Sequence, residues 1–239
     1  MLSDKTFAPD AIAKQRAESA GAGTMTIGAT ILRGFVLLAL LLLTATYGWS
    51  NAGILGTNPW TFLVFFLLLL AISFGAALAP KLAWILGPLY ALLSGVWIGA
   101  ISHAYNDVYS GIVPQAVLAT VAVFLTVLAL YTLRIVRVSN RFVQVVLAAT
   151  LGIVVLYLAT FVLQLFGISL FAYSWLGFGI SLVAAVVASL NLFVDFRFIE
   201  EGATRGAPMY MAWYGAFALL ATLIWLYVEI LRLLSYVRD

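Results

Sequence analysis

Long apolar stretches, each close to the length that crosses a lipid bilayer, are the feature that most limits how this chain can fold. A membrane-spanning helix needs about 20 mostly apolar residues. The chain has 239 residues, of which 65% are hydrophobic and 9% are charged, whereas a soluble domain has about 25% charged residues. The sequence therefore predicts an all-α, polytopic membrane protein.

Turns, prolines and charged residues divide the apolar sequence into seven predicted spans. We place the spans at residues 32–49, 60–78, 82–102, 112–133, 142–166, 174–198 and 211–236. Residues 1–31 are expected to form a mobile or partly helical cytoplasmic tail, and residues 32–239 a single membrane domain. The segments 103–111 and 199–210 are expected to be loops. Span three has Gly95 and Gly99 on one face and contains Pro88, so we expect it to pack closely against a neighbour or to bend.

The distribution of Lys and Arg predicts the orientation. Basic residues fall on one side of the predicted membrane up to the sixth span, whereas the loops 50–59, 103–111 and 167–173 contain none. The positive-inside rule therefore places the N-terminus in the cytoplasm of a cell-membrane protein. Seven crossings put Arg232 and Arg238 outside, against the rule, which leaves a re-entrant last helix as an alternative. Because the basic residues are spread over several loops, we expect the lipid bilayer and not nucleic acid as the partner.

Two carboxylates within apolar helices are the main candidates for a functional site. Inserting an ionisable group at the centre of a membrane span costs about 2.5 to 3.5 kcal/mol. Such a group is therefore expected to have a partner, a cavity or a function. Asp195 and Glu229 each lie on a face of small and polar residues. The two faces consist of Ser181, Ala184, Ala188, Asn191 and Asp195, and of Gly215, Ala218, Thr222, Trp225, Glu229 and Arg232. We expect them to pack as a narrow polar seam.

A direct hydrogen bond between the two acids is not the expected arrangement. Span six would descend to the cytoplasm at Asp195, whereas span seven ascends from it to Glu229, and each residue adds about 1.5 Å of rise. In the alternative interpretation, Glu229 pairs with Arg232 one turn away or with a lipid headgroup. Asp195 would then cap or anchor a helix end.

Four motifs together resemble one family of membrane proteins. They are APKLAWILGPLYALLSGVWIGAIS at residues 79–102, GIVPQAVLAT at 111–120, NLFVDF at 191–196 and APMYMAWYGAFALLATLIWLYVEILRLL at 207–234. From residue 25 onward, the chain resembles the Bax inhibitor-1 superfamily of seven-span proteins, in particular its bacterial Bax inhibitor-1/YccA-like branch. The resemblance implies a helical bundle in the bacterial inner membrane, with outer helices around the last one.

The resemblance also implies a function, a calcium leak gated by a pair of acids that sense pH. Asp195 matches the first acid of that pair. Two alignments remain open for the second acid, one placing Thr222 at that position and the other Glu229. The predicted ion- or proton-sensing residues are therefore Asp195 and Glu229, with Asn191, Thr222 and Arg232 in support. Ca²⁺ would be the permeant ion, bound near Asp195, and no cofactor is expected.

Three other functions are compatible with parts of the sequence. Gly179 to Ser181 form a G-x-S, but the chain's one histidine, His103, precedes this serine and lies at the outer mouth of span three. An intramembrane serine protease is therefore disfavoured, and we expect no enzymatic activity. A secondary transporter would explain Pro88 and the glycines of span three, but the chain has no internal repeat. A regulatory or structural membrane protein without transport remains open.

Overall fold

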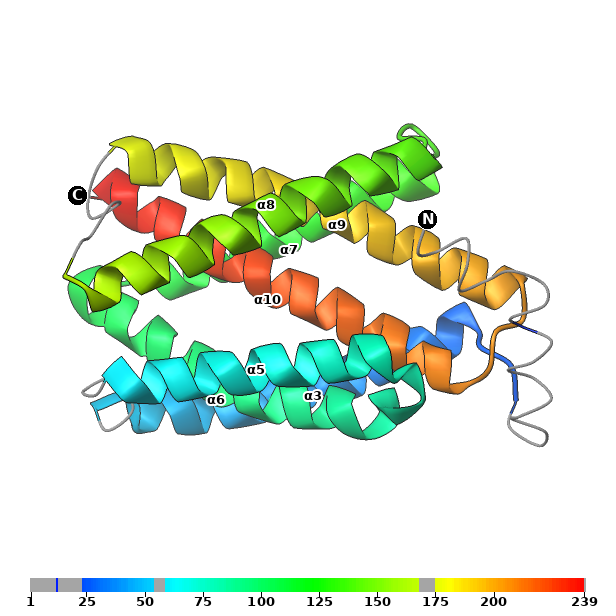
Figure 1. Cartoon of the computed structure of the whole chain (residues 1–239), viewed down its shortest axis with the longest axis horizontal. Helices are drawn as coiled ribbons and strands as arrows, with labels where there is room; N and C mark the ends of the chain where they lie inside the picture. The colour runs from blue at the N-terminus through cyan, green and yellow to red at the C-terminus, as the bar shows by residue number, and fades with distance from the viewer. Residues whose placement is uncertain (1–11, 13–22, 54–58, 168–174, 239) are drawn as a thin grey trace. The chain divides into compact units, whose positions relative to one another are not determined.

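The computed structural model describes residue 12 and residues 23–53, 59–167 and 175–238 (Figure 1). Seven α-helices and one short 3-10 helix, Pro80–Leu82, account for most of these residues, which contain no β-strand. The α-helices are α3 (Ile27–Ser50), α5 (Pro59–Leu78), α6 (Ala83–Val108), α7 (Ile112–Thr132), α8 (Asn140–Leu165), α9 (Trp175–Thr204) and α10 (Tyr210–Arg238). The predicted all-α fold is thereby confirmed for the described residues.

Six of these helices are long and apolar enough to cross a membrane, namely α3, α6 with the preceding 3-10 turn, α7, α8, α9 and α10. The span predicted at residues 60–78 coincides with α5. Within α5, Leu67–Leu78 forms an apolar stretch that is shorter than the other six. Seven helices are therefore present in the described part of the chain. The crossing of the bilayer by α5 remains a prediction.

Several predicted helix ends are wrong because charged residues lie on the helices and not in loops. α6 continues to Val108 and α9 continues to Thr204, so most of the predicted loops 103–111 and 199–210 are helical. The extra turns contain pairs four residues apart, which face each other on a helix. His103 Nδ1 lies 3.0 Å from Asp107 Oδ2, and Arg197 Nε lies 2.6 Å from Glu201 Oε1.

The chain divides into two compact units. The first consists of Met1–Val108 and Asp195–Ala221, and the second of Tyr109–Val194 and Thr222–Asp239. Helices α9 and α10 each contribute residues to both units.

In the first unit, three glycines bring α3 and α6 into backbone contact. A Cβ atom on Gly95 would overlap the carbonyl oxygen of Leu41, and one on Gly99 would overlap that of Ala45. On the opposite helix, a Cβ on Gly48 would overlap the carbonyl oxygen of Val96. Small residues of this kind let membrane helices approach closely. The predicted close packing of span three is therefore confirmed.

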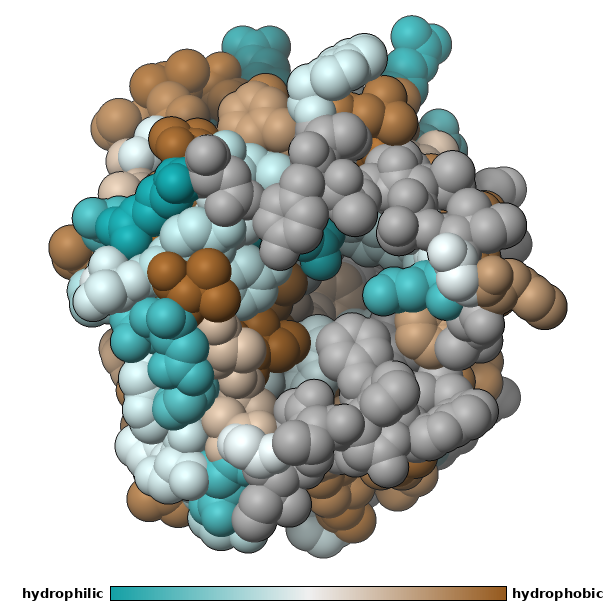
Figure 2. All heavy atoms as spheres, turned by 90° about the vertical axis from the view of Figure 1, so that its left-hand side faces the viewer, coloured by the Kyte–Doolittle hydropathy of each residue, from teal (hydrophilic) through white to brown (hydrophobic). Residues whose placement is uncertain are grey.

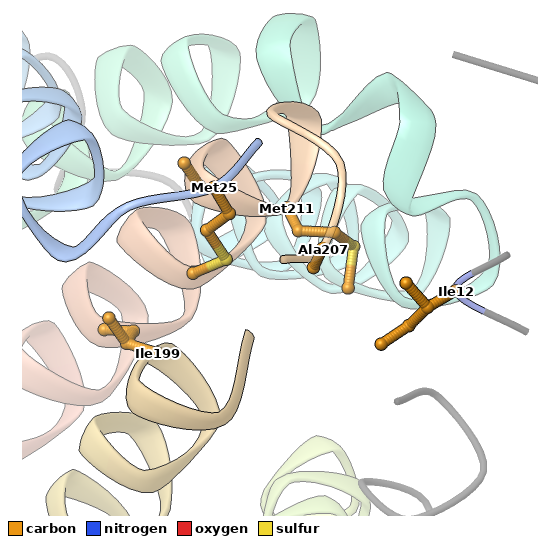
Figure 3. Packing of buried hydrophobic residues seen from close by; sticks show 6 residues of the cluster. Ile12, Met25, Ile199, Ala207 and Met211 are labelled. Atoms are coloured by element: carbon orange, nitrogen blue, oxygen red, sulfur yellow. The ribbon is translucent and has the colours of Figure 1, made fainter. Parts of the chain in front are cut away.

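The residues just before α3 pack against the turn between α9 and α10. The Met25 N–H donates to the Ala207 carbonyl at 2.7 Å, and Thr24 forms an isolated antiparallel bridge with Pro208. Met25 is 1% exposed and belongs to an apolar cluster shown in Figure 3, with Ile12, Ile199, Ala207, Met211 and Ala212. Residues 24–30 were expected in a mobile or partly helical tail, and in the structure they are packed and partly helical, because α3 begins at Ile27.

In the second unit, α8 packs against the parts of α9 and α10 that belong to that unit. The buried residues Ile153, Ala184 and Val187 form an apolar cluster, with Tyr157 and Trp225 packed against it. Ala184 and Ala188 are fully buried, so the small-residue face predicted on span six meets protein. The other faces of α8 and α9 present exposed Val and Leu side chains, as expected of lipid-facing surfaces. In the end-on view of Figure 2, hydrophilic and hydrophobic side chains are interspersed.

Candidate functional site

The second unit contains a buried carboxylate, that of Glu229, which is held by residues from three helices. Glu229 is 1% exposed. Its Oε1 atom accepts hydrogen bonds from the Tyr157 hydroxyl at 2.8 Å and from Trp225 Nε1 at 3.2 Å. Its Oε2 atom lies 3.2 Å from the guanidinium of Arg232, and the Ser181 hydroxyl is a further hydrogen-bond partner. We call these five residues the Glu229 cluster.

Tyr157 links the two charges of the cluster. Its hydroxyl donates to Glu229 and accepts a hydrogen bond from Arg232 at 3.0 Å. The guanidinium carbon of Arg232 also lies 5.2 Å from the centre of the Tyr157 ring, a cation–π distance. Arg232 therefore contacts the carboxylate of Glu229 and both the hydroxyl and the ring face of Tyr157.

Helical spacing explains why these side chains meet. Trp225, Glu229 and Arg232 are separated by four and three residues, so they share one face of α10. On α8, Ile153 and Tyr157 are likewise four residues apart and face α9 and α10. The local geometry of an α-helix therefore pairs Glu229 with Arg232, whereas Tyr157 and Ser181 reach them through tertiary packing.

A second polar contact lies further along the same helices. Asn191 Nδ2 on α9 donates to Thr150 Oγ1 on α8 at 2.8 Å and to the Val187 carbonyl at 2.9 Å. Asn191 follows Ser181 by ten residues, or about 15 Å along the helix. The cluster of Ile153, Ala184 and Val187 packs between these two levels. The seam between α8 and α9 is thus polar at two levels, with an apolar layer between them.

Asp195 belongs to the first unit, where it lies on α9 in electrostatic contact with the Tyr214 phenol of α10. Two turns further along α9, the Glu201 carboxylate is bound by Arg197 at 2.6 Å and lies 3.8 Å from Arg205. The end of α9 therefore has a pair of arginines around one acid. Asp195 itself is half-buried.

The structure brings together only some of the predicted site residues. Glu229 and Arg232 are paired, as the alternative interpretation of Glu229 expected. Asn191 binds Thr150, a residue that the sequence did not single out, and Thr222 lies seven residues before Glu229 on α10. Asp195 and Glu229 fall in different units.

Sequence reasoning missed one member of the Glu229 cluster, Tyr157, and did not assign the contact that a second member, Ser181, makes. Tyr157 is a single tyrosine in an apolar helix, 72 residues from its partner, and neither spacing nor motif marks it. Ser181 was considered as a protease nucleophile and as part of the small-residue face. In the structure its hydroxyl is bound to Glu229, whereas His103 of the first unit contacts Asp107 and the edge of Trp49.

The described residues contain no group of three or more His, Cys, Asp or Glu side chains that could hold a metal ion. Binding of Ca²⁺ near Asp195 therefore remains a prediction. What the Glu229 cluster can do chemically is hold one proton or one negative charge in a buried setting with an arginine beside it.

The family model described as Bax inhibitor 1 like matches residues 5–239, nearly the whole chain. Comparison with curated proteins finds no match.

Proposed function

Because the chain belongs to the Bax inhibitor 1 like family, we propose that it is a cell-membrane protein through which a cation, specifically calcium, leaks under the control of intramembrane acids. In this proposal all seven helices cross the bilayer and the N-terminus is cytoplasmic. The observation that supports the proposal best is the burial of Glu229 within an apolar helix. Ionisable residues in membrane spans are functional candidates by default.

The proposed control works through the proton on each acid. With Glu229 ionised, Arg232, Tyr157, Trp225 and Ser181 all direct donors at its oxygens, and α8, α9 and α10 are tied together. A proton on Glu229 would remove the charge that Arg232 pairs with and would loosen the contact between these helices. Asp195 would act near the cytoplasmic end of α9, where an ionised carboxylate suits calcium, a cation that prefers oxygen ligands.

Calcium flux into liposomes containing the purified protein tests the proposal. We expect the flux of the wild-type protein to differ between pH 5 and pH 8, roughly the range in which a perturbed carboxylate titrates. The Asp195→Asn variant keeps the side-chain shape but removes the titratable charge, so its flux should be nearly insensitive to pH. Glu229→Gln should behave in the same way if the two acids are coupled.

Matched controls are available on the same protein. Asp107→Asn and Glu200→Gln remove acids outside the Glu229 cluster and away from position 195, and should preserve the pH response. Absence of cation flux through the wild-type protein at every pH would contradict the leak. A wild-type pH response in both Asp195→Asn and Glu229→Gln would contradict the assignment of these acids.

A second candidate, a membrane protein without transport, is favoured by one specific observation. Both oxygens of Glu229 are bound by neighbouring side chains, as expected of a carboxylate whose role is to hold helices together. For this candidate, Glu229→Gln should lower thermal stability while liposomes with the wild-type protein pass no calcium.

A further inference from the structure

The methionines of the described residues gather at one contact of the first unit. The chain has no cysteine and four methionines, of which Met1 lies outside the described residues. Met25 and Met211 are buried members of the apolar cluster in Figure 3, and Met209 packs against that cluster. Thioethers are therefore the only sulfur groups that this chain offers to an oxidant, and the three described ones lie together.

The three methionines differ in how far they are open to solvent. Met25 and Met211 are each 1% exposed, whereas Met209 is partly buried and packs on the outside of the cluster. The turn before Met209 lies at a polar surface, because Arg205 is exposed and contacts Glu201 at 3.8 Å. Oxidation of methionine follows exposure. An oxidant dissolved in water therefore reaches Met209 before the two buried methionines.

Met209 packs on the segment that precedes α3. Its methyl carbon Cε lies 3.4 Å from the position that a Cβ atom on Gly23 would occupy, so the end of the side chain touches the backbone there. The next two residues of the segment form the backbone links to Ala207 and Pro208. Pro208 in turn directly precedes Met209. A change in the Met209 side chain therefore acts next to both links.

The cluster leaves little room for a polar group. Met25 Cε and Ile199 Cγ1 lie 3.5 Å and 3.1 Å from the position of a Cβ atom on Gly215, so the segment is tightly packed against α9 and α10. A methionine sulfoxide is polar and carries one more oxygen atom than the thioether. A polar group in apolar surroundings is unfavourable without a hydrogen-bond partner. An oxidised side chain at the edge of this cluster would therefore turn toward water.

We propose that Met209 is a site of reversible oxidation by hydroperoxides, and that its sulfoxide releases residues 23–25 from the turn between α9 and α10. The sulfur of Met209 attacks one oxygen of hydrogen peroxide, and the S–O bond forms as the O–O bond breaks. The proton of the transferred oxygen passes to the second oxygen, which leaves as water, and sulfur supplies the two electrons. A methionine sulfoxide reductase reverses the step, as a dithiol is oxidised to a disulfide and the sulfoxide oxygen leaves as water.

Peroxide treatment of the purified full chain in liposomes tests the proposal, with tandem mass spectrometry to follow each sulfoxide. We expect the sulfoxide of Met209 to form before those of Met25 and Met211. Deuterium exchange at the Met25 amide should then rise by about fivefold or more, because its hydrogen bond to Ala207 is lost. Methionine sulfoxide reductase should restore slow exchange. Exchange that stays fast after the sulfoxide has been removed would contradict a reversible release.

Three variants separate oxidation from packing. Met209→Leu conserves the volume but has no oxidisable sulfur, so peroxide should leave exchange at the Met25 amide slow and should delay oxidation of Met25. Met211→Leu is the matched control, because it removes a buried thioether from the same cluster and should leave the response of Met25 to peroxide as in the wild type. Met209→Gln places a polar group at this position and should speed exchange without peroxide.

Two results would overturn the proposal. One is oxidation of Met25 at the same rate as Met209 from the start of the treatment. The other is a sulfoxide at Met209 with unchanged exchange at Met25, which would leave the three methionines as packing residues only. Exchange in α8 of the second unit should stay as slow after oxidation as before it. A parallel rise in α8 would show general unfolding and would contradict a local release.

Discussion

The hydroxyl of Tyr157 donates to the Glu229 carboxylate at 2.8 Å, and this bond joins α8 to α10 in the apolar part of the second unit. The same hydroxyl accepts a hydrogen bond from Arg232. The ion pair of α10 is thereby tied to a neighbouring helix by one phenolic oxygen. Removal of that oxygen is the simplest way to separate the ion pair from α8.

We expect Tyr157→Phe to lower the free energy of unfolding by about 1 kcal/mol or more, because the buried carboxylate loses a donor while the ring remains. Thermal unfolding in detergent measures the effect. Tyr47→Phe is the matched control, since Tyr47 is an exposed residue of α3, and it should leave stability unchanged. Equal stability of the two variants would show that Glu229 does not depend on Tyr157.

Gly99→Ala should destabilise the first unit. The added Cβ would overlap the carbonyl oxygen of Ala45, which belongs to helix backbone, so α3 and α6 would have to move apart at a cost of about 1 to 3 kcal/mol. Gly152→Ala provides the comparison, because a Cβ at that helical position meets nothing within 4 Å. This control should be neutral or stabilising, and the difference between the two melting temperatures in detergent tests the helix contact.

Ala184→Leu should overpack the apolar cluster of the second unit. Ala184 is fully buried beside Ile153 and Val187, and extra methylene groups in a packed core cost roughly 1 to 3 kcal/mol. Ala188→Leu should have a similar effect at another fully buried position of α9. Val186→Leu places its added volume on an exposed face of the same helix. Melting temperatures that fall equally for all three variants would argue against specific packing at position 184.

Arg134→Gly should stabilise the end of α7, because Arg134 has a φ of 55° and glycine adopts positive φ without a steric penalty. The expected gain is about 1 kcal/mol in the free energy of unfolding. Arg137→Gly removes the same charge at a residue without a left-handed backbone and should give no gain. If both variants are stabilised alike in detergent, charge repulsion and not backbone conformation limits stability in this loop.

Reporter fusions test the orientation. A reporter fused after Arg137 should report a cytoplasmic position, and one fused after Asn51 an exterior position. The opposite pattern would contradict the predicted orientation. A reporter after Arg238 examines the last helix, because a cytoplasmic signal there would show that α10 does not cross.

Sequence reasoning located the helices but misjudged several of their ends. Hydrophobicity marks the apolar part of a helix, and charged residues were interpreted as loops. In the structure, His103 pairs with Asp107 and Arg197 pairs with Glu201, each across one helical turn. α6 and α9 therefore extend past their apolar parts. Gly95 and Gly99 were recognised because small residues four apart have a direct consequence for helix packing.

Only the contacts of the candidate site that lie within a single helix could be predicted from the sequence. The pairing of Glu229 with Arg232 follows from a spacing of three residues. The contribution of Tyr157 depends on how α8 packs against α10, and the burial of Met25 depends on the turn after α9. Such contacts arise from tertiary packing between distant segments, which the residue pattern of one helix does not contain.

The bond between Met25 and Ala207 has a consequence for how the chain is made. Helix α3 begins two residues after Met25, whereas Ala207 precedes α10. During synthesis from the N-terminus, the start of α3 therefore has no final packing partner until nearly the whole chain has been inserted. Long-range contacts of this kind form late. A ribosome-bound chain that ends before α9 should accordingly expose Met25 to proteolysis, and protection should appear once the turn that contains Ala207 has emerged.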